Sequence, residues 1–203
     1  MSKSEHMIMN NNENLIISFG GLALVFGGIL PFEFLNYLSS IYKNNCDLVF
    51  FIDKEQCWYH KGIKGITKGI CGTMLYLNNI IKNGNYKKVI FMGTSAGGYA
   101  SILFGSLCNN VSHVVSFIPQ TKIQNAVNKK YSNLKNIINK KTKYNLYGNT
   151  SFENVNGHHH ISQCENIEYF PNVTVHKNDS CNLKQLRDNG SIKKILDDIL
   201  FKD

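Results

Sequence analysis

A serine set between two glycines is the feature of this sequence that most directly indicates chemistry. The segment Gly93-Thr94-Ser95-Ala96-Gly97 follows a short apolar run and precedes a segment compatible with a helix. This order of strand, tight turn and helix is that of a nucleophile elbow, in which the serine hydroxyl attacks an acyl carbon. The glycines fit because such a turn leaves no room for side chains two residues either side of the serine. The pattern predicts Ser95 as a nucleophile; the alternative is a glycine-rich turn that only packs.

Backbone N–H groups close to Ser95 are the expected stabilisers of negative charge on a reacting oxygen. The helix that follows the turn directs its first N–H groups toward the serine, so Ala96 is one predicted oxyanion donor. A second donor is expected from Gly20-Gly21, which follows the first apolar run, and we assign it to Gly21. Gly20 is predicted to let a ligand approach the backbone closely. A glycine turn without a ligand is the alternative for this pair.

The elements that must position these residues follow from alternating short apolar runs and longer amphipathic segments. Such alternation predicts an α/β fold with about six mostly parallel strands, helices on both faces and no large cap. Strands are expected at residues 14–19, 47–52, 89–92, 113–118, 144–147 and 172–176. Helices are expected at residues 31–42, 66–83, 96–107, 159–165 and 182–200, the last broken at Gly190, with partial helix over 119–141. Ligands bind such sheets beyond the carboxyl ends of the strands.

Length and charge bound the remaining possibilities. The chain has 203 residues, which suits one domain over residues 13–203, preceded by a polar segment 1–12 that is expected to be disordered. The net charge is +8, but the lysine surplus is spread along the chain and no nucleic-acid-binding motif accompanies it, so no nucleic-acid partner is predicted. No run approaches the roughly 18 apolar residues of a membrane span. The oligomeric state is left open.

Cysteine and glycine patterns argue against a cofactor or a metal. The six cysteines form no C-x-x-C pair, which predicts free thiols and a cytoplasmic, reducing location. No paired Cys/His spacing indicates zinc. A dinucleotide-binding fingerprint would need glycine where Ser95 stands, and no Gly-Lys-Ser/Thr phosphate loop is present. No cofactor and no metal are therefore expected.

Several segments together resemble the α/β-hydrolase superfamily and, more narrowly, a compact hydrolase-like family associated with surface-polysaccharide genes. The segments are Ser18–Gly21, Asp53 with Cys57–Gly62, the Ser95 turn, Phe117–Thr121 and Leu186–Gly190. The resemblance implies acyl chemistry: hydrolysis of an ester, thioester or amide, or transfer of an acyl group to another acceptor. It also implies a catalytic triad in the order serine, acid, histidine, with the acid after strand 144–147 and the histidine after strand 172–176.

The base and the acid implied by this resemblance do not match cleanly. The family pattern places a histidine where this chain has Cys181, and a thiol is a poor proton shuttle near neutral pH. His176 lies at the end of the preceding strand and is the predicted base. The expected acid loop contains one carboxylate, Glu153, which is the predicted acid, while Asn156 stands roughly where the family tends to place an aspartate.

Two further groups of residues keep alternatives open. His158, His159 and His160 could supply the base from another direction or bind a metal, or could simply form a polar helix start. Trp58 and Tyr59 lie on a loop beyond the second strand, where aromatic rings suit contact with a sugar or an acyl chain; a loop pinned by a buried tryptophan is the alternative.

Two functional hypotheses result. The first is a serine-dependent acyl hydrolase of esterase type, or an acyltransferase, acting on a small-molecule or glycan acyl substrate. The second is a degenerate relative that kept the Ser95 turn, lost its base and binds a glycan, an acyl group or a protein at the old pocket. A histidine nitrogen within about 3.5 Å of Ser95 Oγ would favour the first.

Overall fold

The computed structural model describes residues 3–22, 32–151, 157–179 and 181–202. One sheet holds all seven strands of these residues, in the order β1-β3-β2-β4-β5-β6-β7. All neighbouring pairs are parallel except β1 and β3, which are antiparallel. The strands are β1 (Glu5–Ile8), β2 (Asn14–Phe19), β3 (Asp47–Phe51), β4 (Lys88–Thr94), β5 (His113–Phe117), β6 (Lys143–Asn149) and β7 (Val173–Asn178).

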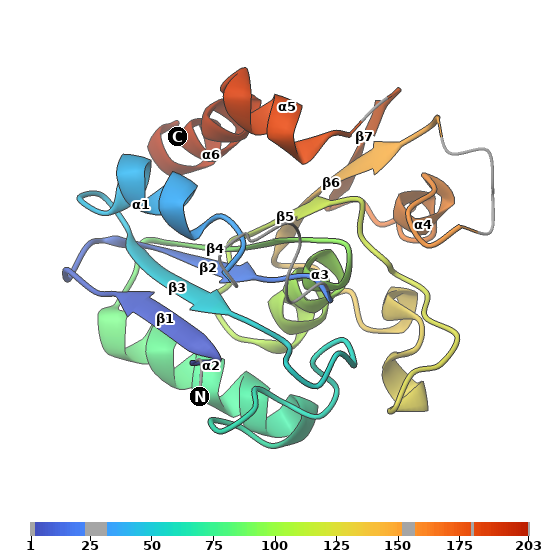
Figure 1. Cartoon of the computed structure of the whole chain (residues 1–203), viewed down its shortest axis with the longest axis horizontal. Coiled ribbons are helices and arrows are strands. Elements are labelled where there is room, and N and C mark those ends of the chain that lie inside the picture. The colour runs from blue at the N-terminus through green and yellow to red at the C-terminus, as the bar shows by residue number, and fades with distance from the viewer. Residues whose placement is uncertain (1–2, 23–31, 152–156, 180, 203) are drawn as a thin grey trace.

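Helices cover both faces of this sheet, as the alternating pattern predicted (Figure 1). They are α1 (Leu35–Tyr42), α2 (Gly69–Gly84), α3 (Ala96–Leu107), α4 (Ser162–Glu165), α5 (Leu183–Asp188) and α6 (Ser191–Phe201). The α/β class and the mostly parallel sheet are confirmed. No large cap is inserted between the strands in the part of the chain that the structure describes.

Two hydrophobic layers hold the sheet, one on each face. Successive side chains of a strand point to opposite faces, so Ile16 packs with α1 and α6 while Ile17 packs with α2 and α3. The strands β2, β3, β4 and β5 are buried on both sides, which explains why they read as continuous apolar runs. In the second layer, α3 has ten buried residues among its twelve, because its small side chains let it lie close to the sheet.

The expectation of disorder over residues 1–12 is corrected by the structure. Glu5–Ile8 forms β1 and pairs antiparallel with β3, Glu5 opposite Phe51. Ser4 extends this contact, because its backbone oxygen accepts a hydrogen bond from the Ile52 N–H group at 3.0 Å. The sheet therefore has one strand more than the sequence pattern predicted.

Other corrections concern helix ends and one long connection. The helix expected from residue 31 begins at Leu35, and the one expected from residue 66 begins at Gly69. Residues 119–141 hold only two short 3-10 helices, Lys129–Tyr131 and Leu134–Asn136. The break expected at Gly190 is confirmed: this glycine has a φ of 77° and separates α5 from α6.

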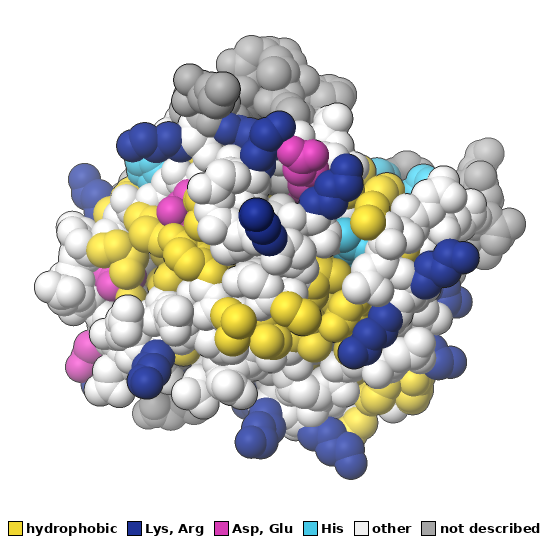
Figure 2. All heavy atoms as spheres, turned by 90° about the horizontal axis from the view of Figure 1, so that it is seen from below, with side chains coloured by type: hydrophobic (Ala, Val, Ile, Leu, Met, Phe, Trp, Pro, Cys, Tyr) yellow, Lys and Arg dark blue, Asp and Glu magenta, His cyan; other side chains and the backbone are white. Residues whose placement is uncertain are grey.

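Charge and apolar surface are distributed without a single dominant patch on the face shown in Figure 2. Lysine and arginine side chains are scattered around that face, and hydrophobic side chains lie between them. All six cysteines are free thiols, and Cys71 alone among them is exposed. None of the described helices combines the length and the apolar character needed to cross a membrane.

Candidate active site

Ser95 occupies a sharp, strained turn between β4 and α3. Its backbone has a φ of 55° and a ψ of −115°, a conformation that side-chain-bearing residues rarely adopt. Its N–H group donates to Phe117 O at 3.0 Å, which ties the turn to the end of β5. A Cβ atom on Gly93 would lie 2.4 Å from the Gly97 backbone, and one on Gly97 would lie 2.0 Å from Phe19 O. Glycine is therefore required at both positions, as the sequence pattern predicted.

His159 supplies the hydrogen-bond partner of the Ser95 hydroxyl. The distance from Ser95 Oγ to His159 Nε2 is 2.8 Å. His159 reaches this position because the chain beyond β6 stays attached to the end of that strand: the Ile161 N–H group donates to Asn149 O at 3.1 Å. The contact brings together the predicted nucleophile and one member of the His158–His160 cluster.

The environment of His159 favours a neutral ring. Its side chain is half-buried. Burial lowers the pKa of His159 from its ordinary value of 6.5, and the nearby charge of His158 lowers it further. A neutral imidazole has a lone pair on one nitrogen, so His159 can accept the serine proton near neutral pH.

His176, the predicted base, has different surroundings. It lies on β7 opposite Tyr147 of β6, and the two rings stack with their centroids 4.3 Å apart and an interplanar angle of 7°. Its Nε2 atom is buried and has no hydrogen-bond partner in the described residues. The histidine hydrogen-bonded to Ser95 is thus His159, from the loop after β6, rather than His176, from the strand that follows that loop.

Cys181 and the predicted acid complete the comparison with the expected triad. Cys181 is buried, and burial raises the pKa of its thiol to about 11, so the thiol stays protonated near neutral pH. It cannot serve as a base there. Glu153 and Asn156 lie outside the described residues.

The glycine pair after β2 is used differently from the expectation. The Gly20 N–H group donates to Phe51 O at 2.9 Å, and Gly20 O accepts from the Tyr59 hydroxyl at 3.0 Å. Both backbone groups of Gly20 are thus engaged inside the protein, which argues against its predicted contact with substrate. The Gly21 N–H group donates to Glu33 Oε2 at 3.3 Å, so a carboxylate holds the predicted oxyanion donor.

Glu33 was not singled out by the sequence, and its carboxyl group has an unusual titration. Burial raises its pKa from 4.5 to about 7, although the hydrogen bond from the Gly21 N–H group opposes this effect. The group keeps its proton in the folded chain at pH values where the unfolded chain has already released it. Ionisation therefore favours unfolding, and the folded state loses stability as pH rises from about 4.5 to about 7.

Glu33→Gln removes this titration while keeping the shape of the side chain. We expect the variant to match the wild type in stability at pH 4.5 and to exceed it by about 1–3 kcal/mol at pH 8. Urea unfolding at both pH values measures the difference. Glu13→Gln, at a glutamate whose side chain is 71% exposed, is the matched control. Equal stability differences at the two pH values would show that Glu33 does not titrate in this way.

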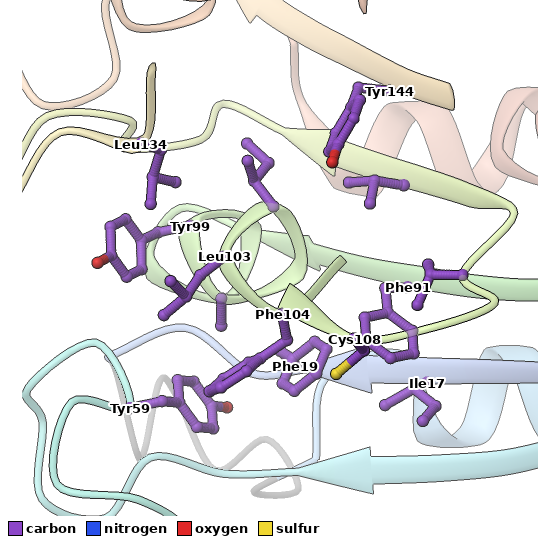
Figure 3. Close-up of a cluster of buried hydrophobic side chains, with 14 of the residues drawn as sticks. Ile17, Phe19, Tyr59, Phe91, Tyr99, Leu103, Phe104, Cys108, Leu134 and Tyr144 are labelled. Atoms are coloured by element: carbon purple, nitrogen blue, oxygen red, sulfur yellow. The ribbon is translucent and has the colours of Figure 1, made fainter. Parts of the chain in front are cut away.

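Tyr59 belongs to the hydrophobic core and not to a substrate surface. Its side chain is fully buried, and Figure 3 shows its ring beside Phe104 and near Phe19. Its hydroxyl donates to the carbonyl groups of Gly20 and Phe51. The loop is pinned by Asp53, whose Oδ2 accepts from the Tyr59 N–H group at 2.8 Å. The predicted substrate contact of Tyr59 is corrected accordingly.

Trp58 lies near His159 and is hydrogen-bonded to Gln120. Its indole N–H group donates to Gln120 Oε1, and Gln120 Nε2 lies 3.5 Å from His159 Nε2. Gln120 is 5% exposed, whereas Trp58 is partly exposed. No grouping of three or more His, Cys, Asp or Glu side chains that could hold a metal occurs within the described ranges.

Comparisons with known proteins identify the fold. No family model and no curated protein matches the chain. Among solved structures, the capsule O-acetyltransferase of Neisseria meningitidis serogroup A is similar, with a TM-score of 0.64, 14% identity, and coverage of 91% of this chain and 87% of that chain. A lipase-esterase related protein from Clostridium acetobutylicum ATCC 824 has a TM-score of 0.59 and 14% identity, covering 95% of this chain and 98% of that chain. The Pyrococcus furiosus esterase Pf2001 has a TM-score of 0.58 and 15% identity, covering 98% and 86%. The predicted α/β-hydrolase fold is confirmed.

Proposed function

We propose that this chain is a serine-dependent acyl hydrolase of esterase type, or an acyltransferase, in which Ser95 on a nucleophile elbow is the nucleophile and His159 the base. The observation that carries the proposal is the 2.8 Å contact between Ser95 Oγ and His159 Nε2. Acyl chemistry also agrees with the fold, which this chain shares with esterases and an O-acetyltransferase. No cofactor and no metal are needed for this reaction.

The proposed reaction has two half-reactions. Ser95 Oγ attacks the acyl carbon while its proton passes to His159 Nε2, and the imidazolium then returns that proton to the leaving oxygen. The acyl-serine is next attacked by water in a hydrolase, or by a hydroxyl group of an acceptor in a transferase. His159 removes the proton from that second nucleophile and gives it back to Ser95, which restores the starting state.

Negative charge on the tetrahedral intermediate would be stabilised by backbone N–H groups. Ala96 is the first residue of α3, where N–H groups have no partner within the helix. Gly21 is the proposed second donor, and an oxyanion there would replace the Glu33 carboxyl group that now accepts from it. One such donor accounts for about 10²–10³ in rate. Glu153 is the proposed acid that orients His159.

The proposed substrate class is an acylated glycan or a related small acyl ester. The likeness to a capsule O-acetyltransferase supports a glycan, and a partly exposed Trp58 beside the site offers an aromatic face of the kind that packs on sugars. Nucleic acid is not a proposed partner. Six free thiols support a cytoplasmic, reducing location.

Labelling with a fluorophosphonate probe tests the proposal. In such a reaction the serine oxygen displaces fluoride from phosphorus, and the serine is phosphonylated only when a base activates it. We expect the folded wild type to be labelled and Ser95→Ala to show no labelling, while Ser40→Ala, which removes an exposed hydroxyl from α1, keeps the wild-type level. Hydrolysis of p-nitrophenyl acetate should follow the same order.

The binding-module hypothesis predicts the opposite result. It rested on Cys181 at the position implied for the base, and the structure brings a histidine to Ser95 from another loop. A folded wild type that is neither labelled nor active on acetyl esters would reject the enzyme proposal. Binding of glycans and acyl ligands would then be the next measurement.

A further inference from the structure

Two loops with strained backbone meet at Gln120, whose amide group lies beside His159 Nε2. Trp58 and Tyr59 have φ values of 56° and 60°, and Ile118 has a φ of 41°, which is rare for a β-branched residue. The first loop carries the Trp58 indole. In the second loop, Ile118 directly precedes the Pro119-Gln120 segment. Strain of this kind persists only where surrounding contacts enforce it and is concentrated at functional sites.

The contacts at Gln120 fix which way its amide group points. An indole N–H can only donate, so the oxygen of Gln120 must face Trp58. The amide nitrogen, which can only donate, then faces His159 Nε2 at 3.5 Å. The Ser95 hydroxyl approaches the same nitrogen at 2.8 Å. Because the amide N–H group of Gln120 can only donate, it favours the tautomer in which Nε2 carries the lone pair and the ring proton of neutral His159 lies on Nδ1. The Ser95 hydroxyl, which can donate or accept, then donates to Nε2 as well.

We propose that Gln120 is a positioning residue, oriented by Trp58, that holds His159 in the tautomer able to accept the Ser95 proton. This inference rests on the proposed function of the Ser95–His159 pair. The amide N–H group also faces the Nε2–H bond of the imidazolium that forms during the reaction, and it cannot accept from that bond. An amide donor that faces Nε2 disfavours the protonated ring, which keeps His159 neutral and able to accept a proton near neutral pH.

Other charged and titratable groups near His159 are few in the described residues. His158 precedes it in the chain and lowers its pKa together with burial. His160 Nδ1 accepts from the Ser162 N–H group at 3.1 Å, which holds that ring within its own turn. Gln120 is neutral and lies opposite His159 Nε2, so Gln120→Glu introduces a negative charge there with little change in shape.

The test combines ring-nitrogen NMR with kinetics in Gln120→Glu and Trp58→Phe. The ¹⁵N shifts of the His159 ring, assigned with His159→Asn, report its tautomer and titration without requiring activity. We expect the Nδ1–H form in the wild type. A carboxylate facing Nε2 in Gln120→Glu should favour the Nε2–H form, raise the pKa of His159 by about one unit or more, and reduce kcat/KM for p-nitrophenyl acetate at pH 7 by at least about tenfold. The acid limb of the kcat/KM profile should shift upward by the same amount.

Trp58→Phe keeps an aromatic ring and removes the donor that orients Gln120. We expect a mixed tautomer population and a loss of a few-fold in kcat, with the acid limb shifted toward higher pH. Gln185→Glu, on the exposed part of α5, adds the same charge elsewhere and should change nothing. This variant set remains informative if Gln120→Glu fails to fold.

The outcomes separate the two proposals. An Nε2–H tautomer in the wild type, or a tautomer and titration that neither substitution changes, would overturn the role of Gln120 even if esters are hydrolysed. A different outcome is that the two variants show the expected NMR changes while the wild type hydrolyses no ester and takes up no fluorophosphonate. That result would support the positioning role of Gln120 and reject the hydrolase proposal.

Discussion

His159→Ala is expected to lower kcat/KM for acetyl esters by about 10³-fold or more, while His176→Ala keeps activity within a few-fold of the wild type. Without the imidazole, no other described residue offers Ser95 Oγ an acceptor at hydrogen-bond distance, so the backbone donors and substrate binding are what still assist the reaction. His176 instead stacks on Tyr147, so its replacement removes packing at the edge of the sheet. Steady-state kinetics on both folded variants measure the contrast.

The pH profile of the wild type provides an independent check on His159. Burial and His158 lower the pKa of His159 below 6.5. The protonated ring, which cannot accept a proton, should therefore become the major form only below pH 6.5. We expect the midpoint of the acid limb of kcat/KM to lie below pH 6.5. Equal losses in the two histidine variants, or an acid limb centred above pH 6.5, would contradict the assignment of His159 as the base.

The centre of the sheet was predictable because β2, β3, β4 and β5 are almost entirely buried. Such strands appear as uninterrupted apolar runs, and Asn14–Phe19 was expected with the bounds that β2 has. β1 escaped prediction for the opposite reason. Its four residues include Glu5 and His6, they are only partly buried, and they are ordered by pairing with β3 some 40 residues later. A local pattern does not report such long-range pairing.

The strained turn that carries Ser95 was predictable, and the histidine that contacts Ser95 was not. The glycines around Ser95 are required by backbone contacts within the turn and with the adjacent end of β2, so they leave a local signature in the sequence. The choice among three consecutive histidines depends on how the chain returns to Asn149 after β6, which is a tertiary contact. Strand spacing directed the prediction to His176, whereas the histidine hydrogen-bonded to Ser95 is His159, which was among the alternatives considered.

Roles of polar residues near the site were the least predictable. The orientation of the Gln120 amide depends on its hydrogen bond with Trp58, which lies 62 positions earlier in the chain. Glu33 gains its raised pKa from burial against β2 and β4, and no neighbouring residue in the sequence indicates this. Tyr59 was misassigned because an aromatic residue on a loop beyond a strand is consistent both with substrate contact and with a buried anchor; the distinction lies in its complete burial.

Gly97→Ala is expected to cause the largest loss of stability among single methyl additions along the Ser95 turn. The added Cβ would lie 2.0 Å from Phe19 O, 2.8 Å from Phe19 C and 3.0 Å from Gly20 C, all of which are backbone atoms. No side chain can rotate to make room, so α3 must move away from the end of β2. We expect a loss of about 3 kcal/mol, and a melting temperature lower by roughly 6–12 °C.

Gly72→Ala is the matched control within a helix. A Cβ on Gly72 meets only Thr67 Cβ, at an ordinary contact distance of 3.9 Å, and alanine favours the helix over glycine by up to about 1 kcal/mol. That variant should therefore melt at or above the wild-type temperature.

Because the end of β2 leads into Gly20 and Gly21, the shift in Gly97→Ala should also separate Gly21 from Ser95. Even the folded fraction should then lose acyl-transfer activity by at least about tenfold. A folded Gly97→Ala enzyme with wild-type melting and kinetics would show that the turn does not need the close contact between α3 and β2 on which the positioning of Ser95 depends.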